Sequence, residues 1–119
     1  MSHNQPVVLL TQKDQGKVIP LHRNQRFSIQ LTENPLTGYS WTICNILGIC
    51  LLTEQFQFNC ILEEVIGHHG VRIFQFQAIH TGKHTLQFKH WREWQGESSI
   101  IEKFQLYKIC YKSFSTSTF

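Results

Sequence analysis

The chain has 119 residues, of which 41% are hydrophobic, 13% aromatic and only 16% charged. This balance is typical of a globular protein and excludes a disordered one, and the length suits one domain, which we place at residues 1–112. The longest apolar run, Ile46–Leu52, contains a glycine and is far shorter than the ~20 residues that a membrane-spanning helix needs. The Ser- and Thr-rich residues 113–119 are expected to form a frayed tail.

The net charge of +3 comes from eleven Lys and Arg against eight Asp and Glu, and the basic residues are spread singly along the chain. A nucleic-acid-binding surface would cluster them, and no basic amphipathic helix for a membrane surface can be drawn, so neither partner is expected. The first twenty residues lack the basic start and the small-residue cleavage site of a secretory signal. Two locations therefore stay open: the cytosol if Met1 is the true start, and a secreted or periplasmic location if a signal was removed before this numbering begins.

Apolar and polar residues alternate in short runs separated by turn residues, a pattern typical of half-buried antiparallel strands. Helical periodicity is nearly absent. The predicted strands are, in chain order, Val7–Leu10, Phe27–Leu31, Tyr39–Ile43, Gln55–Phe58, Phe74–Ala78, Thr85–His90 and Lys103–Tyr107. Their spacing predicts an all-β sandwich of about seven to eight strands. The aromatic residues expected in its core are Phe27, Trp41, Phe74, Phe76, Phe88 and Phe104.

The sequence contains no pattern typical of a catalytic or metal site. The four cysteines, Cys44, Cys50, Cys60 and Cys110, form no Cys-x-x-Cys pair and no zinc-knuckle spacing. Because no secretory signal is present, buried free thiols are favoured over a Cys44–Cys50 disulfide. A cysteine hydrolase is a weaker alternative, since no local signature of a nucleophile is present.

The histidines and carboxylates are equally unspecific. His68 and His69 are adjacent in a turn and have no fixed third ligand, so we expect no metal site. No acid–base pair is recognisable among the carboxylates, so no catalytic residue or cofactor is expected. The carboxylates considered are Asp14, Glu33, Glu63, Glu64, Glu93 and Glu97.

Three loops are unusual for a plain sandwich. The first loop is Asn34, Pro35, Leu36, Thr37, Gly38 and Tyr39; the second is Gly67, His68, His69 and Gly70; the third contains Trp91, Arg92 and Trp94. Pro35 fixes φ and Gly38 can adopt a positive φ, so the first loop is stiff and exposes Leu36 at its tip. The glycines of the second loop let a backbone come close to a partner.

The third loop follows an alternating strand, which can send its two tryptophans to different faces, so at least one is expected to be exposed. Exposed Trp and Arg are the residues most enriched among interface hot spots. Two simpler interpretations stay open at this point. The first loop could be an ordinary hairpin turn, and both tryptophans could lie in the core.

Taken in order, the loops resemble the three signature segments of the chagasin-like inhibitors of papain-family cysteine proteases. That family carries Asn-Pro-Thr-Thr-Gly-Tyr/Phe with a tryptophan two residues on, then Gly-x-Gly-Gly, then Arg-Pro-Trp. The matching segments here are Asn34–Tyr39 with Trp41, Gly67–Gly70 and Arg92–Trp94, and the resemblance covers the chain from about Val18 to Tyr111.

The resemblance implies an immunoglobulin-like β-sandwich with the three loops at one end. It also implies reversible, competitive inhibition by a monomer, without a covalent step, in which the loops enter the cleft of a papain-family cysteine protease. The residues that it places against the protease are Asn34, Pro35, Leu36, Thr37, Gly38, Tyr39, Gly67, His68, His69, Gly70, Trp91, Arg92 and Trp94.

Three positions depart from the family's pattern. Leu36 replaces a threonine, His69 a glycine and Glu93 the proline, so an altered range of target proteases is expected. An alternative from another class is an immunoglobulin-like module that binds a different protein or a glycan through the same loops and inhibits no protease.

Overall fold

A computed structural model describes residues 7–58 and 70–111. In these ranges the chain forms eight strands and four short 3-10 helices, and no α-helix. The strands are β1 (Val8–Thr11), β2 (Val18–His22), β3 (Arg26–Glu33), β4 (Ser40–Asn45), β5 (Ile49–Phe58), β6 (Gly70–Ala78), β7 (Gly82–Trp91) and β8 (Glu102–Tyr111). The 3-10 helices are η1 (Gln12–Asp14), η2 (Pro35–Thr37), η3 (Glu93–Gln95) and η4 (Glu97–Ser99). No helix in this part of the chain is long and apolar enough to cross a membrane.

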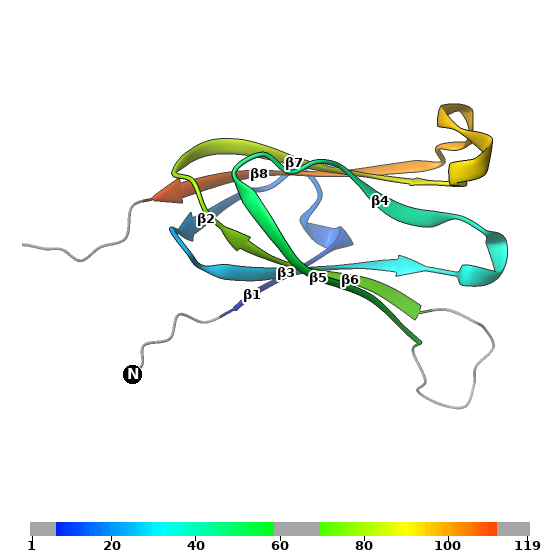
Figure 1. The fold of residues 1–119 in the computed structure, drawn as a ribbon, viewed down its shortest axis with the longest axis horizontal. Helices are drawn as coiled ribbons and strands as arrows, with labels where there is room; N and C mark the ends of the chain where they lie inside the picture. The colour runs from blue at the N-terminus through cyan, green and yellow to red at the C-terminus, as the bar shows by residue number, and fades with distance from the viewer. Residues whose placement is uncertain (1–6, 59–69, 112–119) are drawn as a thin grey trace, which may run out of the picture.

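The strands form two four-stranded sheets, one in the order β1-β3-β6-β5 and the other in the order β2-β8-β7-β4. Figure 1 shows the two sheets as layers, with η2, η3 and η4 together at one end of the molecule. We call this the loop end. The turn between β6 and β7 lies at the opposite end (Figure 1). The architecture is the all-β sandwich that the strand pattern predicts, in the immunoglobulin-like form that the resemblance implies.

Two ladders are parallel, which corrects the expectation of antiparallel strands throughout. β1 pairs with β3 and β2 pairs with β8 in parallel, whereas the other four ladders are antiparallel. β1 and β3 can run in the same direction because the chain between them leaves their sheet to form β2 in the other one. Parallel neighbours require such a crossover, and a tight hairpin cannot join them.

β2 is the strand that the sequence did not predict. Ile19 and Leu21 are buried and alternate with exposed neighbours, as in the other strands. Pro20, however, has no N–H to donate to a ladder and interrupts the strand pattern. The structure places β2 at the edge of its sheet, where a missing donor on the open side is tolerated.

The six aromatic residues expected in the core are all buried, and they form one hydrophobic cluster between the sheets. The rings of Phe27 and Phe76 stack at 5.2 Å, and those of Phe74 and Phe88 lie 4.9 Å apart. Aromatic pairs at such distances contribute about 0.5–1.5 kcal/mol beyond the burial of their area. The cluster joins the strands of the two sheets and thereby fixes the strand ends from which the loops leave.

Three cysteines are described, and all are free thiols. Cys110 is buried as expected, but Cys44 and Cys50 are exposed, so the expectation of buried thiols is wrong for these two. Both lie on edge strands, β4 and β5, next to points where the ladder register shifts. Cys60 and the predicted tail lie outside the described residues.

The turn between β4 and β5 depends on Gly48. Its φ is +76°, and a Cβ atom there would lie 2.7 Å from the ring of His84. We expect Gly48→Ala to lower the stability by about 1–2 kcal/mol, because a left-handed backbone is strained for alanine and the imidazole must move. Thermal unfolding followed by circular dichroism should show a melting temperature lower by roughly 5 °C. An unchanged melting temperature would contradict this role of Gly48.

Candidate functional site

The first loop is closed by its own hydrogen bonds. The Asn34 side-chain oxygen accepts from the Leu36 N–H at 3.0 Å, and the Thr37 hydroxyl donates to the Asn34 carbonyl at 2.8 Å. Gly38, with φ +83°, donates its N–H to the Pro35 carbonyl at 3.3 Å. These bonds hold η2 as a tight turn. Leu36 stands at its tip with 71% of its surface exposed, as the sequence predicts.

The two ends of this loop are held together at its base. The backbone N–H of the buried Trp41 donates to Glu33 Oε1 at 2.9 Å. Its indole Nε1 donates to the Thr32 carbonyl at 2.8 Å. Because Thr32 and Glu33 belong to β3 and Trp41 to β4, these bonds also join the two sheets at the loop end.

The third loop packs directly on the first. Arg92 Nε donates to the Thr37 carbonyl at 3.0 Å, and the Arg92 guanidinium lies 4.3 Å from the centroid of the Tyr39 ring. Trp94 covers Gly38 so closely that a Cβ on Gly38 would lie 2.7 Å from the indole. Trp94 nevertheless remains 70% exposed. The two loops therefore form one continuous surface.

Backbone and side-chain bonds also fix the third loop internally. The Arg92 N–H donates to the Ser99 hydroxyl at 3.0 Å, and that hydroxyl donates to the Gly96 carbonyl at 2.7 Å. Glu93, which stands where the family pattern has proline, begins η3, and its carbonyl accepts from the Gly96 N–H at 3.1 Å. The substitution is thus accommodated in a hydrogen-bonded turn.

Trp91, the first residue of the third loop, contacts side chains of β4 and β7. Its indole Nε1 donates to the Thr42 hydroxyl at 3.0 Å, and the Lys89 ammonium lies 3.4 Å from the centroid of its ring. Trp91 is half-buried, so only Trp94 is strongly exposed. The prediction that at least one of the two tryptophans is exposed is confirmed.

Only one predicted residue of the second loop is described. Gly70 begins β6 and is buried, and a Cβ there would overlap the Phe56 ring and the Gln57 carbonyl. Gly70 therefore belongs to the base of the second loop, where β5 and β6 approach closely. Gly67, His68 and His69 lie outside the described residues.

The family model described as chagasin family peptidase inhibitor I42 matches residues 20–107. The chain belongs to the chagasin family. The resemblance to this family is thereby confirmed, and the protein is a peptidase inhibitor by family and not an enzyme. A comparison with curated proteins found no match.

Two solved structures share the fold of this chagasin-family chain. The cysteine protease inhibitor EhICP2 from Entamoeba histolytica is 21% identical, with a TM-score of 0.80 over 87% of this chain and 95% of the inhibitor. Amebosin is 22% identical, with a TM-score of 0.74 over 89% of this chain and 99% of amebosin. Both likenesses support the two-sheet sandwich.

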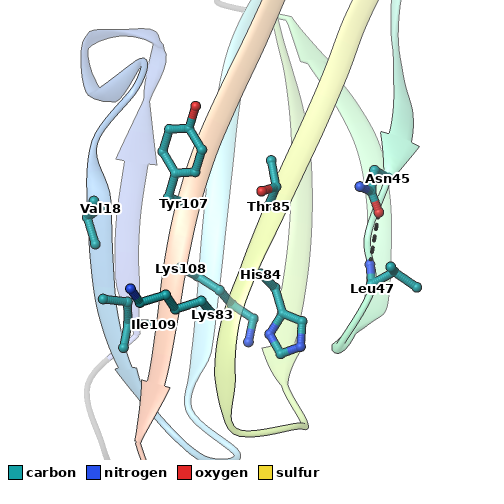
Figure 2. A pocket seen from close by; sticks show the side chains of 9 residues that line it. All are labelled: Val18, Asn45, Leu47, Lys83, His84, Thr85, Tyr107, Lys108 and Ile109. Carbon is teal, nitrogen blue, oxygen red and sulfur yellow. Dashed lines mark hydrogen bonds between the residues drawn. The ribbon is translucent and has the colours of Figure 1, made fainter.

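A separate cavity of about 530 Å³ lies away from the loop end of this chagasin-family protein, between β2, β7, β8 and the turn after β4. Figure 2 shows its lining, which contains Lys83, His84 and Lys108 and no carboxylate. Lys108 is only 2% exposed, and its ammonium donates to the His80 carbonyl at 3.3 Å. The cavity includes no residue of the three loops, so we assign it no part in the site. Among the described residues, no group of His, Cys, Asp and Glu could hold a metal ion.

His90 on β7 is half-buried and contacts the rings of Tyr39 and Trp41. Its ring stacks on Trp41 at 4.5 Å, and in the described part of the chain neither ring nitrogen has a hydrogen-bond partner. Glu102 Oε1 is 3.7 Å from Nδ1, too far for a hydrogen bond. Burial lowers the pKa of His90, and the charges of Glu102 and Glu33 oppose this shift only in part.

This pKa predicts that the fold loses stability in mild acid. Below about pH 6.5 the unfolded chain binds a proton at His90 that the folded state resists, so stability is full above that pH and declines as the pH falls. The melting temperature should therefore fall between about pH 7 and about pH 5. His90→Phe, which keeps an aromatic ring against Trp41, should make this dependence shallower. An equally steep dependence in the variant would show that His90 is not responsible.

Proposed function

We propose that the protein is a reversible, competitive inhibitor of papain-family cysteine peptidases that inserts its loop end into the active-site cleft. The observation that carries this proposal is the packing of Trp94 and Arg92 on the first loop. This packing places two exposed apolar side chains, Leu36 and Trp94, in one preformed surface. Trp and Arg are the residues most often found as interface hot spots.

In this mechanism Leu36, Thr37 and Gly38 occupy the space over the catalytic cysteine and histidine of the peptidase. We expect the loop to be a poor substrate because three of its carbonyls already accept hydrogen bonds within the protein. The Asn34 carbonyl accepts from Thr37, the Pro35 carbonyl from Gly38 and the Thr37 carbonyl from Arg92. Nucleophilic attack would require these bonds to open and the backbone to reach attack geometry.

Tight binding in this mechanism follows from the order that already exists before the peptidase arrives. Each rotamer-rich side chain that is immobilised on binding costs about 0.5–1.5 kcal/mol. The Arg92 guanidinium is held against Thr37 and Tyr39 in the free protein, so most of this cost is absent for Arg92. The second loop, Gly67–Gly70, would offer main-chain groups to an extended edge of the cleft, as a substrate strand does.

Steady-state kinetics of papain or cathepsin L at several concentrations of the protein test the proposal. Competitive inhibition predicts that the apparent KM rises while kcat stays constant, and that the protein remains uncut on a gel. An immunoglobulin-like module for another ligand predicts no effect on any peptidase. A cysteine hydrolase predicts turnover that a thiol-alkylating reagent abolishes.

Alkylation needs one precaution, because Cys44 and Cys50 are exposed. Both cysteines lie on edge strands and not in the surface that Leu36 and Trp94 form. The alkylated and repurified protein should therefore inhibit as well as the untreated one. Excess reagent must be removed first, since it would inactivate the peptidase.

A further inference from the structure

We propose that Glu33 is a positioning residue that fixes the first loop relative to β5 and β6 through Arg72. This inference rests on the proposed function, because its consequence is the shape of the surface offered to a peptidase. Glu33 is the last residue of β3 and directly precedes the first loop. It follows Phe27, Ile29 and Leu31 on the inward face of that strand and is only 3% exposed.

Both carboxylate oxygens of Glu33 are engaged. Arg72 Nη2 donates to Glu33 Oε2 at 2.6 Å, and Arg72 Nε donates to Oε1 at 3.2 Å. The same Oε1 accepts from the backbone N–H of Trp41, which lies just after the first loop. One carboxylate on β3 therefore binds residues of two other strands, because Trp41 belongs to β4 and Arg72 to β6.

Arg72 extends the contact to the base of the second loop. It lies two residues after Gly70, and its Nη1 is 3.5 Å from Glu54 Oε2 on β5. Its guanidinium is 5.5 Å from the centroid of the Phe56 ring, and that ring packs on Gly70. Arg72, on β6, thus also contacts β5, the other strand that flanks the second loop.

The chemistry of this contact suits positioning better than bulk stability. Most other contacts between the two sheets are made by apolar side chains, which have no fixed hydrogen-bond geometry. A bidentate pair between Arg and a carboxylate has a fixed geometry, whereas a buried ion pair adds little net stability compared with an apolar pair. The hydrogen bonds between Arg72 and Glu33, together with the charge of that carboxylate, raise the pKa of Arg72.

The test compares Glu33→Gln and Arg72→Lys with two control variants. Glutamine at position 33 keeps an acceptor for the Trp41 N–H but removes the negative charge. Lysine at position 72 keeps the positive charge but cannot make the bidentate pair with the carboxylate. Leu21→Val is the stability control, because Leu21 is buried in β2 and lies outside the three loops. Asp14→Asn is the charge control, because it breaks the Lys17–Asp14 pair of 3.0 Å, which the three loops do not include.

We expect Glu33→Gln and Arg72→Lys each to raise the inhibition constant for papain at least tenfold at 25 °C, after circular dichroism has shown that every variant and control is folded. The double variant should be no worse than Glu33→Gln alone, since both changes break the same contact. Leu21→Val and Asp14→Asn should inhibit like the wild type. The proposal would be overturned if Glu33→Gln had the inhibition constant of the wild type. It would also be overturned if Leu21→Val, at the same melting temperature as Glu33→Gln, showed an equally raised inhibition constant.

A second measurement does not depend on inhibition. In ¹⁵N relaxation, the amides of Leu36 and Thr37 should lose order in Glu33→Gln and Arg72→Lys but not in the controls. Unchanged order parameters would also overturn the proposal. If the wild type fails to inhibit any peptidase, the proposed function fails, and the relaxation data alone decide whether Glu33 positions the loop.

Discussion

Trp94→Ala is expected to raise the inhibition constant for papain about thirty-fold. Truncating a hot-spot tryptophan costs about 2 kcal/mol or more of binding free energy, and ~1.4 kcal/mol corresponds to a factor of ten. Trp94 is 70% exposed in the free protein, so little of its surface contributes to folding. The melting temperature should therefore stay close to that of the wild type.

The control for this variant is Tyr111→Ala. Tyr111 is also exposed and aromatic, but it ends β8, whereas the third loop precedes that strand. It should change neither the inhibition constant nor the melting temperature. If Trp94→Ala lost stability in proportion to its loss of inhibition, Trp94 would be a packing residue and not a contact to the peptidase.

Gly38→Ala is expected to weaken inhibition at least as much as Trp94→Ala, through two separate effects. At φ +83° alanine is strained by about 1–2 kcal/mol, which favours a different turn around Leu36. The new methyl group would lie 2.7 Å from the Trp94 ring, so the indole must leave its place on the first loop. Titrations of papain with the two single variants and the double variant measure this coupling. Because both changes remove the same contact, the double variant should be less impaired than the product of the single effects.

Gly16→Ala is a control that separates the effect of backbone strain from the effect of the lost contact with Trp94. Gly16 also has a positive φ, +79°, but no atom lies within 4 Å of the position of its Cβ. It should lose stability like Gly38→Ala while inhibiting papain like the wild type. Additive effects of Gly38→Ala and Trp94→Ala would contradict the packing of the indole on the glycine.

The sequence predicts the strands well where one face is buried. In the runs Phe27–Leu31, Phe74–Ala78, Leu86–Phe88 and Phe104–Leu106 apolar residues alternate with polar ones, because a period of two places every second side chain on the core face. β2 has the same alternation, but Pro20 argues against a strand unless its position at a sheet edge is known. β1 pairs in parallel with β3, and β2 pairs in parallel with β8. These pairings depend on which sheet each strand joins, and local alternation cannot reveal that.

The loop motifs are recognisable in the sequence, whereas the contacts between them are not. Pro35 and Gly38 predict a stiff turn from local backbone preferences alone. The bond from Arg92 to the Thr37 carbonyl joins residues 55 positions apart and exists only because β3, β4 and β7 bring their ends together. The packing of Trp94 on Gly38 is equally non-local.

Glu33 is the functional candidate that sequence reasoning missed. A signal was present, because Glu33 continues the inward series Phe27, Ile29 and Leu31 and therefore lies on the buried face of its strand. A carboxylate at such a position requires a partner. The sequence alone does not identify that partner. Arg72 comes within reach of Glu33 only because β3 pairs with β6 in this register.

The most direct measurement of the central claim is the rate of papain, or of cathepsin L, titrated with the wild-type protein. A preformed loop end that fills the cleft predicts that the rate falls toward zero at micromolar inhibitor and recovers on dilution, because no covalent bond forms. A rate that does not fall at micromolar inhibitor with either peptidase would contradict the assignment of this surface to peptidase binding.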